Sequence, residues 1–257
     1  MSAVTLRNVS VVYDDGYQAL RHVDLEIADR DFIGVIGPNG GGKTTLVKAI
    51  LGMVPYTGEV CLADSLYRGS ERLIGYMPQF TEFDRQFPIS VLEVVLSGLQ
   101  GRKGFMSRYS KADRAKAMQL LAEAGIEAVA GRPIGEISGG QMQRALLCRA
   151  VIADPGLLIL DEPANFVDNK FENELYRTLR MLNERMAIVM VSHDIGTITS
   201  VVKEIVCVNR TVHRHRSNII TEEQLLNYGC PIQLISHGHV PHTVLEHHSG
   251  DCCCDHE

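Results

Sequence analysis

One stretch of the sequence has the residue types that suit the binding of a polyphosphate. Residues 37–44 read Gly-Pro-Asn-Gly-Gly-Gly-Lys-Thr, which fits a glycine, any four residues, and then glycine, lysine and threonine. Glycines let bare backbone N–H groups approach the phosphates, because no side chain obstructs them. Lys43 adds a cation for the β- and γ-phosphates, and the Thr44 hydroxyl suits a Mg²⁺ ion that bridges them. The pattern predicts a nucleotide-phosphate loop.

The residues on either side of this loop predict the two elements that must hold it. Residues 32–36 read as a short buried strand, and residues 45–51 as a helix. The phosphates would then lie at a helix N-terminus, which carries roughly half a positive charge. We expect the phosphate site to be lined by Gly37, Pro38, Asn39, Gly40, Gly41, Gly42, Lys43, Thr44 and Thr45.

An acidic pair follows another apolar run. Residues 157–163 read Leu-Leu-Ile-Leu-Asp-Glu-Pro, so the two carboxylates come at the end of a buried strand, where parallel sheets present ligand sites. Asp161 would hold Mg²⁺ through its water shell, and Glu162 would orient or deprotonate an attacking water. Such a pair can also cap the next turn, but a phosphate loop in the same chain favours the catalytic interpretation.

A second glycine pair precedes another helix. Ser138 is a natural N-cap for a helix that runs from Gly139 to Val151, and this helix start would also attract an anion. The chain thus has two phosphate-binding elements but only one of them carries the lysine. We expect the two elements to belong to different halves of a shared site.

The pattern of apolar residues predicts an α/β fold. Continuous apolar runs are typical of parallel strands that are covered on both faces, and a helix between two of them makes a β-α-β unit. The first third of the chain is strand-rich, and a helical subdomain is expected over about residues 84–150. The predicted strands are 4–12, 19–23, 25–27, 58–62, 73–77, 157–160, 187–191 and 205–208, and the predicted helices include 91–99, 111–124 and 171–183.

Composition limits the class of protein. The chain has 257 residues, a net charge of −6 and an isoelectric point near 5.9, which argues against a nucleic-acid partner. We find no apolar run long enough to cross a bilayer and no signal peptide, so we expect a cytosolic chain that reaches a membrane only through a partner. Its seven cysteines are an odd number, which suits a reducing compartment.

Taken in order, these motifs resemble those of the nucleotide-binding subunit of ATP-binding-cassette (ABC) transporters. The resemblance covers residues 1–230 and implies an ABC-type P-loop ATPase domain with an N-terminal antiparallel β-subdomain, followed by a tail over 231–257. It implies that Tyr13 stacks on adenine. It also implies that Gln79 contacts Mg²⁺ and the γ-phosphate and links them to a membrane partner, and that His193 faces the γ-phosphate.

The same resemblance implies a homodimer of ATPase subunits arranged head to tail. ATP and Mg²⁺ would lie between the phosphate loop of one subunit and Ser138, Gly139, Gly140 and Gln141 of the other, with Asp168 in a loop that crosses between them. Hydrolysis by Glu162 would open the pair. The chain departs from the family pattern at Ile137, where leucine is usual, and at the bulky Phe166.

The resemblance also implies partners. A chain with one cassette and no membrane domain would need a separate integral membrane permease, and an extracytoplasmic protein would deliver the cargo. The cassette would lie at the cytoplasmic face of a bacterial inner membrane. Residues 40–45 and 87–98 are similar to the ATPase subunits of zinc and manganese importers.

The tail carries nitrogen and sulfur donors that favour zinc over manganese, which prefers oxygen ligands. They are His237, His239, His242, His247, His248, Cys252, Cys253, Cys254 and His256. We interpret the tail as a flexible segment that binds Zn²⁺ and responds to it. The alternative is a tail with no regulatory role.

Two other interpretations of the whole chain remain. A soluble cassette ATPase of iron–sulfur cluster assembly would use the same ATP site, and an importer of manganese, iron, siderophore or haem would use the same architecture. A DNA-repair or chromosome-organising ATPase would need a long coiled-coil insertion between the phosphate loop and Ser138, and the sequence has none.

Overall fold

A six-stranded sheet forms the centre of the protein. The computed structural model describes residues 2–79, 88–103, 108–163, 169–193, 195–218, 233–237 and 240–244. The central sheet has the order β11-β10-β3-β9-β8-β7, with neighbouring strands parallel except for β11, which is antiparallel to β10. Its strands are β3 (Phe32–Ile36), β7 (Ile74–Met77), β8 (Leu157–Asp161), β9 (Ala187–Val191), β10 (Glu204–Asn209) and β11 (Thr211–His215).

The apolar runs of the sequence are explained by burial of both faces of this sheet. Successive side chains of a strand point to opposite faces. In β8, Leu158 and Leu160 therefore join one hydrophobic core, whereas Leu157 and Ile159 join the other. All five residues of β8 are buried, so an alternating polar pattern is not tolerated there. The prediction of a doubly covered parallel sheet is confirmed.

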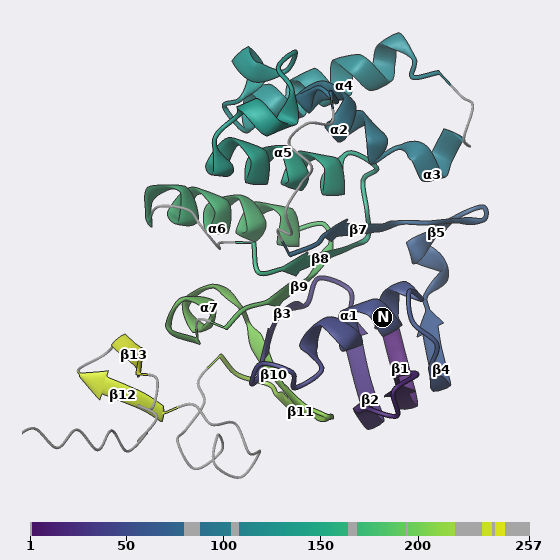
Figure 1. Cartoon of the computed structure of the whole chain (residues 1–257), viewed down its shortest axis with the longest axis vertical. Helices are drawn as coiled ribbons and strands as arrows, with labels where there is room; N and C mark the ends of the chain where they lie inside the picture. Colours follow the sequence, from purple (N-terminus) through teal and green to yellow (C-terminus); the bar gives the residue numbers. More distant parts are fainter. Residues whose placement is uncertain are drawn as a thin grey trace, which may run out of the picture.

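One face of the sheet is covered by a helix and a second sheet (Figure 1). Helix α1 (Lys43–Leu51) buries Leu46, Val47 and Ile50 against the central sheet and the three-stranded antiparallel sheet. That sheet has the order β2-β1-β4 and consists of β1 (Ser2–Val12), β2 (Gln18–Ala28) and β4 (Thr57–Leu62). The strands expected at 19–23 and 25–27 are parts of one strand, β2. The pairing of β1 with β2 shifts register between Leu6 and Val9, so β2 continues without a break.

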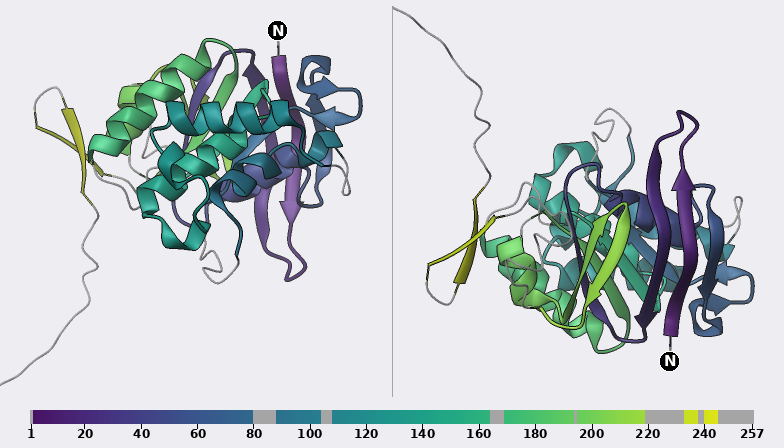
Figure 2. Two further views of the ribbon diagram at one scale, coloured as in Figure 1. Left: turned by 90° about the horizontal axis from the view of Figure 1, so that it is seen from above. Right: turned by 90° about the horizontal axis from the view of Figure 1, so that it is seen from below.

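Helices cover the other face. Among them are α6 (Asn169–Asn183) and α7 (Ile195–Val201), and Figure 2 shows that the helical subdomain lies on the same side. The subdomain contains α2 (Val91–Ser97), α3 (Gln100–Lys103), α4 (Lys111–Glu123) and α5 (Gly139–Val151), together with the 3₁₀ turns Glu127–Val129 and Ile134–Glu136. Ser90 and Ser110 cap α2 and α4 through capping boxes with Glu93 and Asp113, which fixes where these helices begin.

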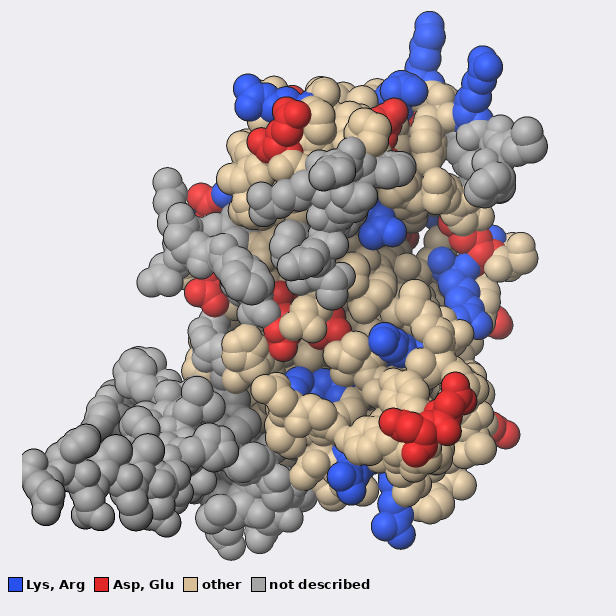
Figure 3. Space-filling model, in the orientation of Figure 1, with Lys and Arg blue, Asp and Glu red and all other residues tan. Residues whose placement is uncertain are grey.

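Several elements have no counterpart in the sequence analysis. They include β11, the short strands β5 (Tyr67–Arg68) and β6 (Glu71–Arg72), and the 3₁₀ turn Asp64–Leu66. In the tail, β12 (Gln233–His237) and β13 (Val240–Val244) pair as an antiparallel hairpin in which His242 lies opposite Ile235. Charged side chains of both signs are interspersed on the face shown in Figure 3, which agrees with the modest net charge.

Candidate functional site

The predicted phosphate loop joins the end of β3 to the start of α1. Gly42 is the N-cap of α1 and has a left-handed φ of 99°, a conformation that L side chains rarely adopt. Glycine has no side chain that could cap the helix, so the first backbone N–H groups of α1 are available to an anion. The strand, loop and helix predicted from the sequence are confirmed, with the helix beginning at Lys43.

The lysine of the loop lies over the loop backbone. Lys43 is only 7% exposed, and its Nζ donates to the carbonyl oxygens of Gly37 at 2.9 Å and Pro38 at 3.0 Å. The two backbone carbonyls hold the ammonium group over the loop. At this position its charge can act on phosphate groups that bind to the loop.

Thr44 and Asp161 meet although they are far apart in the sequence. The Thr44 hydroxyl donates to Asp161 Oδ2 at 3.1 Å. Asp161 is 2% exposed, and this burial raises the pKa of its carboxyl group, although the Thr44 hydrogen bond and the charge of Lys43 oppose the rise. A nearby cation would stabilise this buried carboxylate. Mg²⁺ prefers oxygen ligands, and both side chains supply them. These two residues therefore fit a Mg²⁺ ion.

Glu162 follows at the end of β8 and has a strained backbone. Its φ is 53°, which costs a non-glycine residue roughly 1–2 kcal/mol. Its N–H donates to the carbonyl of Val191 at 3.0 Å, so the conformation is held by the neighbouring strand β9. Strain of this kind is frequent where a side chain must be aimed at a substrate.

The Glu162 carboxylate joins the other two predicted catalytic residues. Gln79 Nε2 donates to Glu162 Oε2 at 2.9 Å, and His193 Nδ1 lies 3.4 Å from Glu162 Oε1. Glu162 is 13% exposed and His193 is 59% exposed on their side chains, so the group is open to solvent on the histidine side. Gln79, Glu162 and His193 come from the ends of β7, β8 and β9, whose carboxyl ends meet at one edge of the sheet.

Tyr13 lies in the turn that follows β1. Its hydroxyl shares a hydrogen bond of 3.0 Å with the hydroxyl of Thr45, in the first turn of α1. The residue is 36% exposed, so part of it is accessible to solvent. The structure thus brings Tyr13 to the phosphate loop, where an aromatic ring can stack on a base.

Ser138 begins α5, as its sequence context predicts. Its Oγ accepts from Gln141 N at 3.3 Å, and Gln141 Oε1 accepts from Ser138 N at 3.1 Å, which forms a capping box. Helix α5 packs in the core on one face of the central sheet and α1 in the core on the other (Figure 1). The two predicted phosphate-binding helices therefore lie on opposite sides of the sheet within one chain.

Two residues that contact the loop were missed by the sequence analysis. Tyr17 donates its hydroxyl hydrogen to the carbonyl of Gly40, and the backbone N–H of Arg210 donates to the carbonyl of Gly41. A second tyrosine close to Tyr13 could have drawn attention to Tyr17. No local pattern could have pointed to Arg210, because it follows β10, far along the chain.

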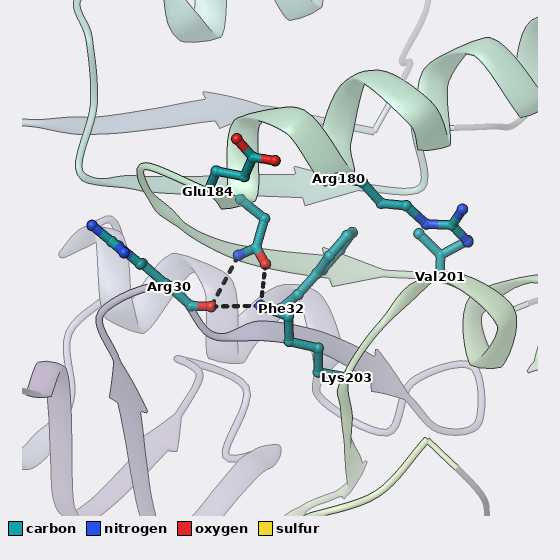
Figure 4. Close-up of a pocket in the computed structure, with 7 residues that line it drawn as sticks. Arg30, Phe32, Arg180, Glu184, Val201 and Lys203 are labelled. Atoms are coloured by element: carbon teal, nitrogen blue, oxygen red, sulfur yellow. Dashed lines mark hydrogen bonds between the residues drawn. The ribbon is translucent and has the colours of Figure 1, made fainter.

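A cavity of about 530 Å³ lies elsewhere, beside the start of β3 (Figure 4). It is lined by Arg30, Phe32, Arg180, Asn183, Glu184, Val201 and Lys203. The Lys203 Nζ donates to Asn183 Oδ1 at 2.6 Å, and Asn183 in turn donates to the carbonyl of Arg30. This cavity contains none of the predicted site residues.

Some predicted residues lie outside the described part of the chain. They are Asp168 and, in the tail, His239, His247, His248, Cys252, Cys253, Cys254 and His256, while only the backbone is described for His237 and His242. Within the described residues, no group of three His, Cys, Asp or Glu side chains is arranged to hold a metal ion, and no helix is long and apolar enough to cross a membrane.

Comparison with known proteins gives consistent matches. A family model described as ABC transporter matches residues 20–165. The zinc import ATP-binding protein ZnuC of Pseudomonas putida is 40% identical over 212 residues, which cover 81% of this chain and 76% of that protein. The manganese transport system ATP-binding protein MntB of Bacillus subtilis is 39% identical over 199 residues, covering 77% and 79%.

The fold is also found in solved structures. The ATP-binding cassette MJ0796, solved as a dimer in a post-hydrolysis state with ADP and Pi, matches with a TM-score of 0.69 and 26% identity. The match covers 85% of this chain and 100% of that one. The matched region of the family model contains the phosphate loop, Gln79, Ser138 and both carboxylates at the end of β8.

Proposed function

Since the chain belongs to the ABC transporter family and is one of its ATPases, we propose that it drives the import of zinc through a separate permease. The observation that carries the ATPase chemistry is the meeting of Gln79, Glu162 and His193 next to the phosphate loop. The choice of zinc is supported by the 40% identity to a zinc import protein and by the donors of the tail.

The proposed roles of the loop residues follow from their positions. The backbone of residues 37–42 and the start of α1 hold the phosphates of ATP, and Lys43 neutralises part of their charge. Thr44 and Asp161, with Gln79 nearby, would hold Mg²⁺. When bound, Mg²⁺ supplies positive charge to the β- and γ-phosphate oxygens.

Hydrolysis is assigned to the residues at the ends of β7, β8 and β9. Glu162 accepts a proton from the attacking water, and Gln79 and His193 orient its carboxylate and the γ-phosphate. The Glu162 carboxylate contacts Gln79 and His193, whereas the Asp161 carboxylate accepts from Thr44, so one acid would serve the water and the other the cation. Tyr13 stacks on the adenine base.

The complete site is proposed to need two copies of the chain. Ser138, Gly139, Gly140 and Gln141 lie on a helix that packs on the opposite side of the sheet from α1, so a second copy would have to present them to the loop. The dimeric cassette among the solved relatives supports this arrangement. Asp168 would lie in the loop between the two subunits.

Import also requires partners at a membrane. An integral membrane permease would carry zinc across, an extracytoplasmic metal-binding protein would deliver it, and this chain would lie peripherally at the cytoplasmic face of the bacterial inner membrane. The name of the Pseudomonas relative as an import ATP-binding protein supports such an assembly. No nucleic-acid partner is proposed, because the net charge is −6.

The metal content of cells tests this function. In metal-poor medium, cells that lack the chain are expected to lose zinc while keeping their manganese and iron, and the natural chain should restore the zinc whereas Glu162→Gln should not. Mass spectrometry of whole cells measures all three metals at once. Unchanged zinc in the deletion strain would contradict the proposal.

Manganese is the second candidate, because the chain is 39% identical to a manganese transport ATP-binding protein. A fall in manganese alone in the same cells would favour this candidate. Unchanged metals together with failing iron–sulfur enzymes would instead indicate a cassette ATPase of cluster assembly.

The tail is proposed to bind Zn²⁺ and to slow transport when cytosolic zinc rises. Its histidines and its run of cysteines from 252 to 254 supply donors that bind zinc well. Deletion of residues 237–257 is expected to remove the inhibition of ATP turnover by micromolar Zn²⁺ in the reconstituted transporter, while turnover without zinc stays unchanged. Equal zinc sensitivity of the two forms would exclude this role.

A further inference from the structure

The phosphate loop accepts hydrogen bonds from two residues that are far apart in the sequence. The Tyr17 hydroxyl donates to the carbonyl of Gly40 at 2.7 Å, and the N–H of Arg210 donates to the carbonyl of Gly41 at 2.8 Å. The Arg210 guanidinium carbon also lies 5.6 Å from the centre of the Tyr17 ring, within the range of a cation–π contact. The two residues thus contact each other as well as the loop.

The backbone of Arg210 is held by hydrogen bonds at both its N–H and its carbonyl group. It occupies the turn between β10 and β11 with a left-handed φ of 59°, and its carbonyl accepts from Arg21 N at 2.7 Å. The preceding strand end also lies close to the loop, because a Cβ atom added at Gly41 would be 2.8 Å from the carbonyl oxygen of Val208. The turn is therefore fixed between β2 and the loop.

These contacts determine how the loop presents its N–H groups. The N–H and C=O of one trans peptide point in opposite directions. Holding the Gly41 carbonyl therefore orients the N–H of Gly42 at the start of α1, and holding the Gly40 carbonyl orients the N–H of Gly41, which donates to the Pro38 carbonyl at 3.0 Å. A loop held in this way loses less conformational freedom when phosphates bind.

We propose that Tyr17 and Arg210 are positioning residues that hold the loop in the conformation that binds the triphosphate, an inference that rests on the proposed ATP site. They act on the phosphate end of the nucleotide. Tyr13, which lies in the same turn as Tyr17, acts on the base instead. The two tyrosines of this turn therefore act on different parts of the nucleotide, Tyr13 on the base and Tyr17 on the phosphates.

The test compares two probes, Mg-ATP and Mg-tripolyphosphate, which has the phosphates but no base. Tyr17→Phe removes the hydrogen bond and keeps the ring. Arg210→Gly removes the guanidinium and suits the left-handed turn. For each variant, we expect the affinity for the two probes to fall by the same factor. This factor is about 3- to 10-fold, as for the loss of one hydrogen bond or one ring contact. We also expect the KM for ATP to rise by that factor while kcat stays within about twofold, because Glu162 is untouched.

Three controls make the result specific. Tyr67→Phe, at a tyrosine of similar exposure in β5, should change nothing. Tyr13→Ala should weaken ATP but not tripolyphosphate. Because Arg210 contacts the Tyr17 ring, a double variant of Tyr17→Ala and Arg210→Gly should lose less than the product of the losses of those two single variants.

The proposal fails if Tyr17→Phe binds both probes as the natural chain does, or if it weakens ATP alone, which would assign Tyr17 to the base. Circular dichroism and the thermal midpoint check that each variant is folded. If Arg210→Gly does not fold, Tyr17→Phe alone still tests the proposal. Lys43→Ala tests the site itself, because normal binding of tripolyphosphate by that variant would overturn the proposed ATP site rather than the role of Tyr17 and Arg210.

Discussion

ATP turnover by Glu162→Gln is expected to fall at least about 100-fold, because loss of a general base typically reduces a rate by 10²- to 10⁴-fold. The amide keeps the size of the carboxylate and can still contact Gln79 and His193, so affinity for ATP should stay within about threefold. A rate of phosphate release and a binding constant for ATP, both measured on the purified chain, separate the two effects.

The same variant should accumulate as a closed pair in the presence of ATP, since binding closes the pair and hydrolysis opens it. Light scattering with and without ATP measures this change. Glu184→Gln provides the matched control, because Glu184 is an exposed glutamate next to the remote cavity and should leave turnover and association unchanged. Normal phosphate release by Glu162→Gln would show that another group takes the proton from water.

Gly37→Ala is expected to abolish ATP binding and to lower the stability of the protein. A Cβ atom at this position would lie 2.0 Å from the carbonyl oxygen of Val208, and the φ of 149° is strained for any L side chain. The obstacle is backbone at the end of β10, so the loop itself must move. Such overpacking costs up to about 3 kcal/mol, which corresponds to a fall of roughly 6–12 °C in the thermal midpoint of a chain of this size.

Gly131→Ala is the matched control for this substitution. No heavy atom lies within 4 Å of a Cβ added at Gly131, and its φ is not in the left-handed region. Calorimetry and titration with ATP on the two variants should show a loss only for Gly37→Ala. If Gly37→Ala bound ATP with unchanged affinity, the loop would not need the conformation that it has here.

The sequence alone was sufficient for the features that depend on neighbours along the chain. The phosphate loop, the buried runs of β3, β8 and β9, and the N-cap at Ser138 were predicted because loop chemistry, strand burial and helix capping are determined by residues a few positions apart. The order of these motifs along the chain also indicated the family.

Only the tertiary structure decided which of these features meet. Gln79 and Glu162 are 83 residues apart, and they share a hydrogen bond because β7 and β8 are neighbours in the sheet. Arg210 supports the loop because β10 pairs with β3, and α5 is kept from α1 because the sheet lies between them. The order of the strands and the face of the sheet on which each helix packs depend on how the whole chain packs. The spacing of residues in the sequence therefore does not specify them.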